Sequence, residues 1–319
     1  IIESTMILGG TFLILMNNYA CRWWPEALDA TAPGLGTKLP RVVPSETRVG
    51  SVSSYFVEKY GFSPDAAVVA FSGDNPNSLI GVGGYKPGTA VISLGTSHTY
   101  FAAMNKPLVD PDGYGHVFGN PAGGFMSLIC FKNGALAQEK VRKAFELDWK
   151  QFDDCLLDTP AGNNGNMMLP YFVPEITPLV LDSGPVYQGT DEFVAGEDAA
   201  ARVRAVVEAQ ALRLRIHSAW IERRPSMLRV TGGASKSDEV CQVLADVFNA
   251  RVERLSTGNS AGLGAAMRAA QGIGVGDWAG LTEKFCETEA GGAVDANPEN
   301  VKVYDSTISD FANFANQNG

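Results

Sequence analysis

The sequence predicts a layered α/β fold, and two observations support this. From about residue 66 onward, short apolar runs of strand length alternate with helical patterns, which is typical of a sheet covered by helices. The chain has 319 residues, of which 45% are hydrophobic and 19% charged, so it can bury a sizeable core. No repeat of 20 to 50 residues is present, which argues against a solenoid.

The first 65 residues differ from the rest and predict a connector, so the expected domains are 1–65 and 66–319. The apolar run Met6–Met16 predicts a buried strand pair, because it is too short to span a bilayer and no basic segment precedes it. A short helix is expected around Pro25–Ala30, and helical spacing appears over Val52–Tyr60. Proline and glycine punctuate the remainder of this segment.

The elements of the second region follow from hydrophobic spacing and from glycine and proline breaks. The long helix within 198–224 carries an apolar face through Val203, Val206, Val207, Ala211 and Leu214. In order, we expect a strand at 66–71, a helix at 76–84, a hairpin at 89–104, a strand and helix at 125–145, an irregular excursion at 160–196, that long helix, a strand-turn-helix-strand unit at 226–255, a small-residue helix at 259–274, and an acidic, weakly patterned tail after about 280.

Charge and cysteine content exclude several classes of protein. The formal net charge of −10, without any basic run, argues against nucleic-acid binding, because contact with phosphate backbones needs Lys and Arg. The five cysteines include no C-x-x-C pair, which fits neither a zinc site nor a disulfide framework. We therefore expect a cytoplasmic protein in a reducing compartment, with no membrane or nucleic-acid partner.

The common catalytic motifs are missing. The sequence has no G-x-x-x-x-G-K-[ST] loop, no G-x-G-x-x-G after a strand, no H-E-x-x-H and no G-x-S-x-G. Only three histidines occur, namely His98, His116 and His217, and none is near an obvious catalytic partner in sequence. We expect structural roles for all three.

Two glycine bends have a physical use as anion sites. In "VISLGTSHTY" the hairpin reverses at Gly95, Thr96 and Ser97, where successive backbone N–H groups and two hydroxyls could bind a phosphate. Taken alone, this stretch favours an ordinary hairpin turn. In "LRVTGGASKSDEV" a strand runs through Gly232 and Gly233 into a helix. Such a helix N-terminus attracts phosphates, although tight strand-to-helix packing also explains the glycines.

Asp74, in "VVAFSGDNPNSLIG", has two interpretations. It follows an apolar run and precedes a helix with Pro76 in its first turn, so it or Asn75 could cap that helix. It could also be a base that accepts a proton from a substrate. The order of the three motifs, strand-Asp-helix, then glycine hairpin, then Gly-Gly helix, favours the second interpretation.

These motifs, in this order from about residue 20 to 275, resemble the xylulokinases of the FGGY carbohydrate kinase family, within the actin, Hsp70 and hexokinase superfamily. "GDNPNSL" and "SLGTS" are similar to the eukaryotic-type branch. The matching segments are "VPSETRVGSVSSYFVEKYGF", "VVAFSGDNPNSLIG", "AVISLGTSHTYF", "CFKNGALAQEKVR", "EITP", "VEAQALRLRIH", "VTGGASKSDEVCQVLADVF" and "NSAGLGAAMRAAQGI".

The resemblance implies a ribonuclease H-like nucleotide-binding domain, a mixed sheet with helices on both faces, in a kinase that transfers the γ-phosphate of ATP to the C5 hydroxyl of D-xylulose with Mg²⁺. Asp74 would be the general base, and Asp74 and Asn75 would contact the sugar. The residues that the resemblance assigns to the nucleotide are Gly95, Thr96 and Ser97 at the β and γ phosphates, Gly232, Gly233, Ala234 and Ser237 along the adenosine, and Lys132 and Asn133 at its border.

Three departures from the family pattern limit what the resemblance implies. The Asp-x-Gly-Thr phosphate turn of the family's first domain is not found, and "LVLDSGPV" at Asp182 has Pro185 where Thr belongs. Before Trp23 and Trp24, where relatives are polar and acidic, this chain is apolar. Ser237 stands where the family commonly has Asn near the adenine.

We therefore expect residues 66–319 to be the C-terminal nucleotide-binding domain, and 1–65 a connector with a remnant of the sugar-binding domain. Such a chain should bind nucleotide weakly and show little or no turnover alone. It could form a homodimer or associate with a missing N-terminal domain. Two alternatives remain: a non-catalytic actin- or Hsp70-like module that binds nucleotide or a partner, and a plain fragment of a longer chain.

Overall fold

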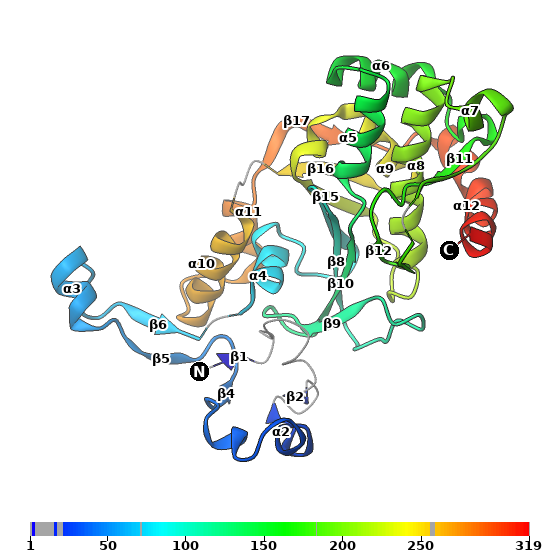
Figure 1. Cartoon of the computed structure of the whole chain (residues 1–319). Coiled ribbons are helices and arrows are strands. Elements are labelled where there is room, and N and C mark those ends of the chain that lie inside the picture. The colour runs from blue at the N-terminus through cyan, green and yellow to red at the C-terminus, as the bar shows by residue number, and fades with distance from the viewer. Residues whose placement is uncertain are drawn as a thin grey trace.

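A seven-stranded mixed sheet forms the centre of the computed structural model, which describes residues 2–3, 16–17, 22–70, 72–182, 184–255 and 259–318. The strand order is β17-β16-β15-β7-β8-β10-β9, and helices cover both faces (Figure 1). This confirms the predicted α/β layers. The strands are β7 (Thr89–Leu94), β8 (His98–Met104), β9 (His116–Gly119), β10 (Phe125–Phe131), β15 (Met227–Thr231), β16 (Arg251–Leu255) and β17 (Thr288–Val294).

The strand directions determine where the two glycine bends lie. Strands β7, β8 and β10 are antiparallel neighbours, and β7 and β8 are joined by the expected three-residue turn, because Leu94 pairs with His98. Strand β15 runs parallel to β7, and β16 runs parallel to β15. The carboxyl ends of parallel strands lie at one edge of a sheet, so the turns that follow β7 and β15 start at the same edge.

Alternation along the strands builds a core on each face of the sheet. Ile92 of β7 and Tyr100 of β8 belong to the larger core, whereas their neighbours Val91 and Phe101 belong to a smaller core on the other face. The helices that pack over the larger core are α5 (Ala135–Ala144), α6 (Trp149–Asp158), α8 (Ala199–His217), α9 (Asp238–Phe248) and α12 (Pro298–Asn318).

Helix α8 is more enclosed than its apolar pattern predicts. The five apolar residues of the expected face are buried, but so are the polar side chains of Arg202, Arg204, Glu208, Gln210 and Arg213. Neighbouring α5, α6, α9 and α12 surround the helix. Polar side chains on a helix buried on several sides need hydrogen-bond or ionic partners. Arg213 pairs with Glu175, and Gln210 binds the carbonyls of Asn133 and Gly134.

The tail was expected to be weakly patterned, and this expectation is wrong. Residues 278–285 form α11 (Trp278–Phe285), residues 288–294 form the edge strand β17, and the 21-residue α12 follows. Tyr304, Phe311 and Phe314 of α12 are buried against α8 and α9. Their spacing places all three on one face of α12, which packs against the core, and the charged residues between them lie on its exposed side.

The opposite face of the sheet is covered by α4 (Asp74–Gly81), α10 (Ser260–Gly272) and α11. Helices α4 and α10 are in very close contact, as the small residues of α10 predict: a Cβ added at Gly264 would lie 1.8 Å from the Asn77 carbonyl oxygen. A Cβ at Gly81 would lie 1.9 Å from the Ser260 oxygen. Only glycine permits this separation.

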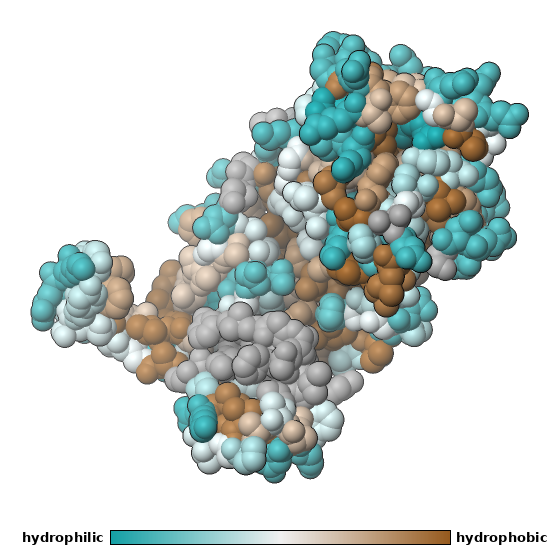
Figure 2. Space-filling view, in the orientation of Figure 1, coloured by the Kyte–Doolittle hydropathy of each residue, from teal (hydrophilic) through white to brown (hydrophobic). Residues whose placement is uncertain are grey.

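Residues 22–70 form small elements outside the main sheet, at the lower left in Figure 1. The strand expected at 66–71 is shorter and pairs with β5 rather than with the central sheet. Figure 2 shows hydrophobic surface along this arm, where Val49 and Val68 are exposed. The elements are β3 (Arg22–Trp23), α2 (Pro25–Thr31), η1 (Leu35–Thr37), β4 (Val42–Val43), β5 (Arg48–Ser51), α3 (Ser54–Tyr60) and β6 (Ala67–Val69).

Two further predictions can be compared with the structure. Most of Met6–Met16 lies outside the described residues, which at this end hold β1 (Ile2–Glu3) and β2 (Met16–Asn17). The excursion at 160–196 is irregular as expected and contains a cis Thr177–Pro178 bond. Its short elements are η2 (Asn163–Gly165), β11 (Met167–Leu169), β12 (Glu175–Ile176), β13 (Leu179–Val180), β14 (Val186–Gln188) and α7 (Asp191–Ala195). Within the described ranges, no helix has both the length and the apolar character needed to cross a membrane.

Candidate nucleotide site

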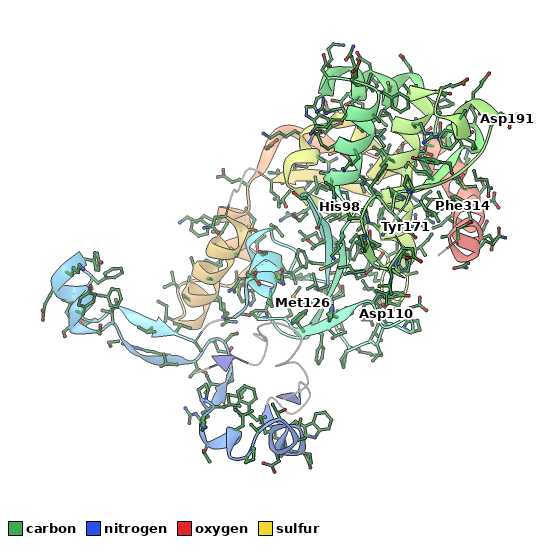
Figure 3. The ribbon with its side chains drawn as sticks, viewed as in Figure 1. His98, Asp110, Met126, Tyr171, Asp191 and Phe314 are labelled. Atoms are coloured by element: carbon green, nitrogen blue, oxygen red, sulfur yellow. The ribbon has the colours of Figure 1, made fainter. Side chains whose placement is uncertain are left out.

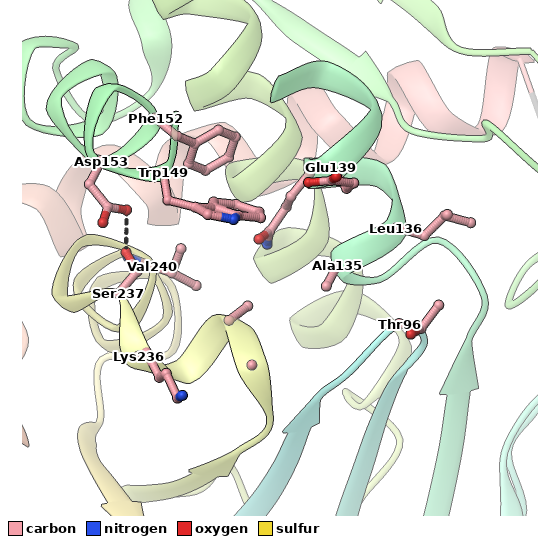
Figure 4. Close-up of a pocket in the computed structure, with 13 residues that line it drawn as sticks. Thr96, Ala135, Leu136, Glu139, Trp149, Phe152, Asp153, Lys236, Ser237 and Val240 are labelled. Carbon is pink, nitrogen blue, oxygen red and sulfur yellow. Dashed lines mark hydrogen bonds between the residues drawn. The ribbon is translucent and has the colours of Figure 1, made fainter. Parts of the chain in front are cut away.

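A pocket of about 620 Å³ opens where β7, β15, α5, α6 and α9 meet (Figure 4). Four residues that the sequence singled out line it: Thr96 after β7, and Gly233, Ala234 and Ser237 between β15 and α9. The pocket therefore joins segments more than 130 residues apart in the sequence.

The two glycine bends lie side by side. A Cβ added at Gly232 would lie 2.7 Å from the carbonyl carbon of Leu94 and 3.0 Å from the backbone nitrogen of Gly95. Gly232 also has φ +97°, a conformation that other residues adopt only with strain. Both the backbone conformation and the close approach therefore require glycine at Gly232.

The turn Gly95–Ser97 is held from behind by the first turn of α5. The N–H of Ala135 donates to the Gly95 carbonyl at 2.9 Å, and the N–H of Leu136 donates to the Thr96 carbonyl at 3.3 Å. In a trans peptide the N–H points opposite to the C=O, so the N–H groups of Thr96 and Ser97 point away from α5. Two adjacent N–H groups on one side of an exposed turn can bind an anion.

Lys132 and Asn133 do not line the pocket. Lys132 is exposed, whereas Asn133 is buried behind the turn and its side chain is fully engaged. Its Nδ2 donates to the Val173 carbonyl and to Glu175 Oε2, each at 2.9 Å, and its Oδ1 accepts from the Val173 N–H at 3.1 Å. The side chain of Asn133 therefore forms hydrogen bonds to Val173 and Glu175, whereas the family resemblance implied that Asn133 borders the nucleotide.

Asp74 is exposed at the first residue of α4, and it is not among the residues that line the pocket. The residue in the capping position is Gly73, which supplies no side-chain bond. Asp74 Oδ1 accepts the N–H of its neighbour Asn75 at 2.8 Å. Asp74 is thus not the cap of this helix, and as a carboxylate in the first turn it interacts favourably with the helix dipole. Its role as a base stays a prediction.

The sequence did not point to α6, which supplies an aromatic wall of the pocket. Trp149 is 50% exposed, and its ring meets that of Phe152 edge-on at 5.4 Å (Figure 4). The Arg142 guanidinium lies 5.0 Å from the Trp149 ring centroid. A half-exposed tryptophan in a pocket can stack against a planar base. The Asp148 and Gln151 capping box could have located this helix, but not its position beside the pocket.

Several polar groups that line the pocket are paired with one another or with neighbouring residues. Ser237 caps α9 by accepting the Val240 N–H at 3.1 Å, and its hydroxyl lies 2.7 Å from Asp153 Oδ1 (Figure 4). Burial raises the pKa of the Asp153 carboxyl. Hydrogen bonds from Arg142 and then Lys143 lower the pKa of Glu139 to about 2, so Glu139 is ionised. Lys236 adds a positive charge to the same lining.

His98 directly follows the turn and lies in the interior of the domain (Figure 3). Burial lowers the pKa of His98 to about 3, with the Arg213 charge acting in the same direction. Burial also lowers the pKa of His217 to about 4. Both rings are therefore neutral at pH 7, as expected for core histidines. Among the described residues, no group of three His, Cys, Asp or Glu side chains could hold a metal ion.

The C-terminal domain model of the FGGY family of carbohydrate kinases matches residues 90–273, more than half of the chain. Xylulose kinase of Rattus norvegicus is 39% identical over 297 residues, which cover 91% of this chain and 55% of that protein. Xylulose kinase 2 of Arabidopsis thaliana is 37% identical over 78% of this chain and 47% of its own length. The chain thus spans about half the length of these relatives, and the expected resemblance is confirmed.

Solved structures support the same fold. Ligand-bound xylulose kinase of Lactobacillus acidophilus superposes with a TM-score of 0.86 at 22% identity, covering 99% of this chain and 64% of that one. Plasmodium falciparum glycerol kinase with ADP gives 0.77 at 18% identity, covering 95% and 60%. The predicted mixed sheet with helices on both faces is confirmed, and it is the fold of these kinase structures.

Proposed function

The chain belongs to the FGGY family of carbohydrate kinases, and from this premise we propose that it is the nucleotide-binding part of an ATP-dependent D-xylulose kinase. The observation that carries the proposal is the contact between the two glycine bends beside one pocket. A kinase of this kind needs a cradle of main-chain N–H groups for the phosphates and a neighbouring cavity for the nucleoside. The similarity to xylulose kinases supports the choice of sugar.

In the proposed reaction, the C5 hydroxyl oxygen of D-xylulose forms a bond to the γ-phosphorus of ATP. The bond from that phosphorus to the β,γ-bridging oxygen breaks, ADP leaves, and the hydroxyl proton passes to Asp74. The turn at Thr96 and Ser97 would hold the β and γ phosphates, and Asn75 would orient the sugar. Mg²⁺ would be held mainly by phosphate oxygens and water, and its charge would offset that of the transferred group.

The nucleoside would occupy the cavity between Gly233, Ala234 and α6, with the base against Trp149. Ser237 borders this space, but its hydroxyl is engaged by Asp153 and the α9 cap.

We place the reaction in the cytoplasm. Because the chain spans about half of its relatives, we also propose that this chain alone binds nucleotide and turns over little sugar, as a binding module would.

Calorimetric titration with ATP and an assay of ADP release with D-xylulose test the proposal together. Gly232→Ala should raise the Kd for ATP by at least about tenfold, because the added Cβ collides with the Leu94 carbonyl and moves the turn. The matched control is Gly123→Ala, which has a similar φ of +105° but open space around it. Asp74→Asn should lower any turnover about 100-fold or more while ATP binding persists.

Two results would contradict the proposal. One is a wild-type chain that does not bind ATP. The other is a Gly123→Ala variant that loses as much ATP affinity as Gly232→Ala, since backbone strain alone would then explain the effect. Turnover at ordinary kinase rates by this chain would refute only the low activity proposed for it, and an Asp74→Asn variant that keeps full turnover would refute the role of Asp74 as base.

A further inference from the structure

A fully buried carboxylate, Glu175 of β12, lies behind the pocket and has five hydrogen-bond donors. The N–H groups of Lys132 and Ile176 donate to Oε1 at 2.7 and 2.8 Å. The backbone and side-chain N–H groups of Asn133 donate to Oε2 at 3.1 and 2.9 Å, and Arg213 of α8 lies 2.8 Å from the same oxygen. The Glu175 side chain is 0% exposed. Removing a charge from water so completely is unfavourable unless its partners are fixed in place.

Three of these donors belong to Lys132 and Asn133 in the short loop between β10 and α5. Lys132 and Asn133 present consecutive backbone N–H groups to the two oxygens of one carboxylate. The side chain of Asn133 also binds both the N–H and the carbonyl of Val173. Glu175 and Asn133 thus join the loop at 132–134 to the segment at 173–176 at several points, and this leaves the loop little freedom to move.

The carbonyl side of the same loop is held by α8. Gln210 Nε2 donates to the carbonyls of Asn133 and Gly134 at 3.0 and 2.7 Å. Gln138 of α5 donates to Gln210 Oε1 at 2.7 Å, which orients the Gln210 amide. Glu175 therefore holds the N–H groups of Lys132 and Asn133, and Gln210 holds the carbonyls of the next two peptide groups, which lead into α5. The side chains of Glu175, Gln210 and Gln138 are all buried.

The loop at 132–134 contacts the Gly95–Ser97 turn directly. A Cβ added at Gly134 would lie 2.7 Å from the Ser97 carbonyl carbon and 2.7 Å from the His98 backbone nitrogen. The next two N–H groups, of Ala135 and Leu136, donate to the carbonyls of Gly95 and Thr96. Because the two segments pack backbone against backbone, a shift of the loop must displace the turn.

We propose that Glu175 is a positioning residue for the Gly95–Ser97 turn: by holding the loop at 132–134 and through it the first turn of α5, it aims the N–H groups of Thr96 and Ser97 at the nucleotide phosphates. The inference rests on the proposed function, because it assigns that turn to the phosphates. It separates two parts of the site. The nucleoside cavity at Ala234 and Trp149 does not contact Glu175, so loss of this positioning should weaken the binding of phosphate groups and leave the nucleoside contacts intact.

The test compares ATP with adenosine as calorimetric probes of the chain. Glu175→Gln places an NH₂ group against backbone donors in either orientation of the amide. We expect the Kd for ATP to rise about 10- to 100-fold, as occurs when a residue that orients a directly binding group is lost. The Kd for adenosine should change less than threefold. The matched control is Glu208→Gln, which disrupts the other buried Glu–Arg pair of α8, between Glu208 and Arg204, away from the turn.

A second variant covers the case in which Glu175→Gln does not fold. Gln210→Met keeps the volume, leaves no buried charge unpaired and removes the bonds to Asn133 and Gly134, so it should show the same split between ATP and adenosine. The inference is overturned if either folded variant binds ATP as tightly as the wild type, if ATP and adenosine weaken equally, or if Glu208→Gln shows the same split. If the wild type binds neither probe, the proposed function fails first.

Discussion

Helix α8 takes part in two buried ion pairs that look alike in chemistry and differ in what they hold together. Arg213 binds Glu175 from the irregular excursion at 2.8 Å, and Arg204 binds Glu208 of the same helix at 2.7 Å. The first pair fixes the loop at 132–134, behind the Gly95–Ser97 turn. The second fixes α12, because Tyr304 donates to Glu208 Oε1 at 2.8 Å. The consequence of a buried charge therefore depends on the backbone to which its partners belong.

The two carboxylates also differ in how well they are satisfied. Burial by itself raises the pKa of Glu175, but the Arg213 charge and the hydrogen bonds outweigh it, so the pKa lies below its usual range. Burial raises the pKa of Glu208 above its usual range, and Arg204 and Tyr304 offset this only in part. Glu208 accepts hydrogen bonds from Gly162, Arg204 and Tyr304 on one oxygen, whereas the donors of Glu175 are shared between its two oxygens.

The largest effect should come from removing one guanidinium. Arg213→Met leaves Glu175 buried without its counter-ion, and the free energy of unfolding should fall by about 3–5 kcal/mol. Arg204→Met should have an effect of similar size for the same reason. Urea denaturation measures both. If Arg213→Met is no less stable than wild type, Arg213 does not stabilise the buried charge of Glu175, which would contradict the role given to the Arg213–Glu175 pair.

A smaller effect is expected from the hydroxyl that joins α12 to α8. In Tyr304→Phe, Glu208 loses one donor and the Arg204 Nη2 loses its acceptor, so the free energy of unfolding should fall by about 1–3 kcal/mol. Affinity for ATP should stay at the wild-type value, because α12 lies away from the turn. A loss of ATP affinity in Tyr304→Phe would show that the two ion pairs are coupled through α8, and that the Arg204–Glu208 pair also affects the Gly95–Ser97 turn.

The smallest effect should be in pH dependence, and the two pairs should respond with opposite sign. Glu175 has a lowered folded-state pKa, so its contribution to stability is present above the unfolded value of 4.5 and is lost as pH falls through the folded value. Glu208 has a raised pKa, so stability rises as pH falls through that value toward 4.5.

Denaturation at stepped pH measures both differences. The stability gap between wild type and Glu175→Gln should narrow below pH 4.5, and the gap between wild type and Glu208→Gln should widen as pH falls toward 4.5. For Glu208→Gln, taking the gap removes the background from buried His98 and His217, which destabilises wild type and variant in acid below about pH 6.5. For Glu175→Gln it removes only part of that background, because the Glu175 charge raises the pKa of both histidines. Gaps that change in the same direction would contradict the contrast between the carboxylates.

Local patterns were sufficient for most of the fold. The hairpin at Gly95, the strand-glycine-helix unit at Gly232 and the small-residue helix at 259–274 all form as predicted, because each depends on short-range spacing and backbone conformation. The tail differed from its prediction because its acidic composition hides the helical spacing of the buried residues Tyr304, Phe311 and Phe314. The strand at 67–69 was located, but no local pattern shows which sheet a strand joins.

The site was less predictable than the fold. The sequence pointed to Thr96, Gly233, Ala234 and Ser237, which share the pocket, but it did not point to Trp149, whose role depends on where α6 lies. It assigned Asn133 to the nucleotide, and the structure turns that side chain toward Glu175 instead. Short-range spacing cannot show which polar residue faces a cavity and which faces a neighbouring loop.

By itself, the sequence determined the layered α/β fold, the two glycine bends and the family, because these depend on residue types at fixed short spacings. The tertiary structure decided which segments meet: that Gly232 lies against Leu94, that α6 closes the pocket, and that Glu175 holds a loop some 40 residues away in the sequence. The physical reason is that burial and hydrogen bonding depend on contacts in space, and those contacts arise only when the strands and helices pack together.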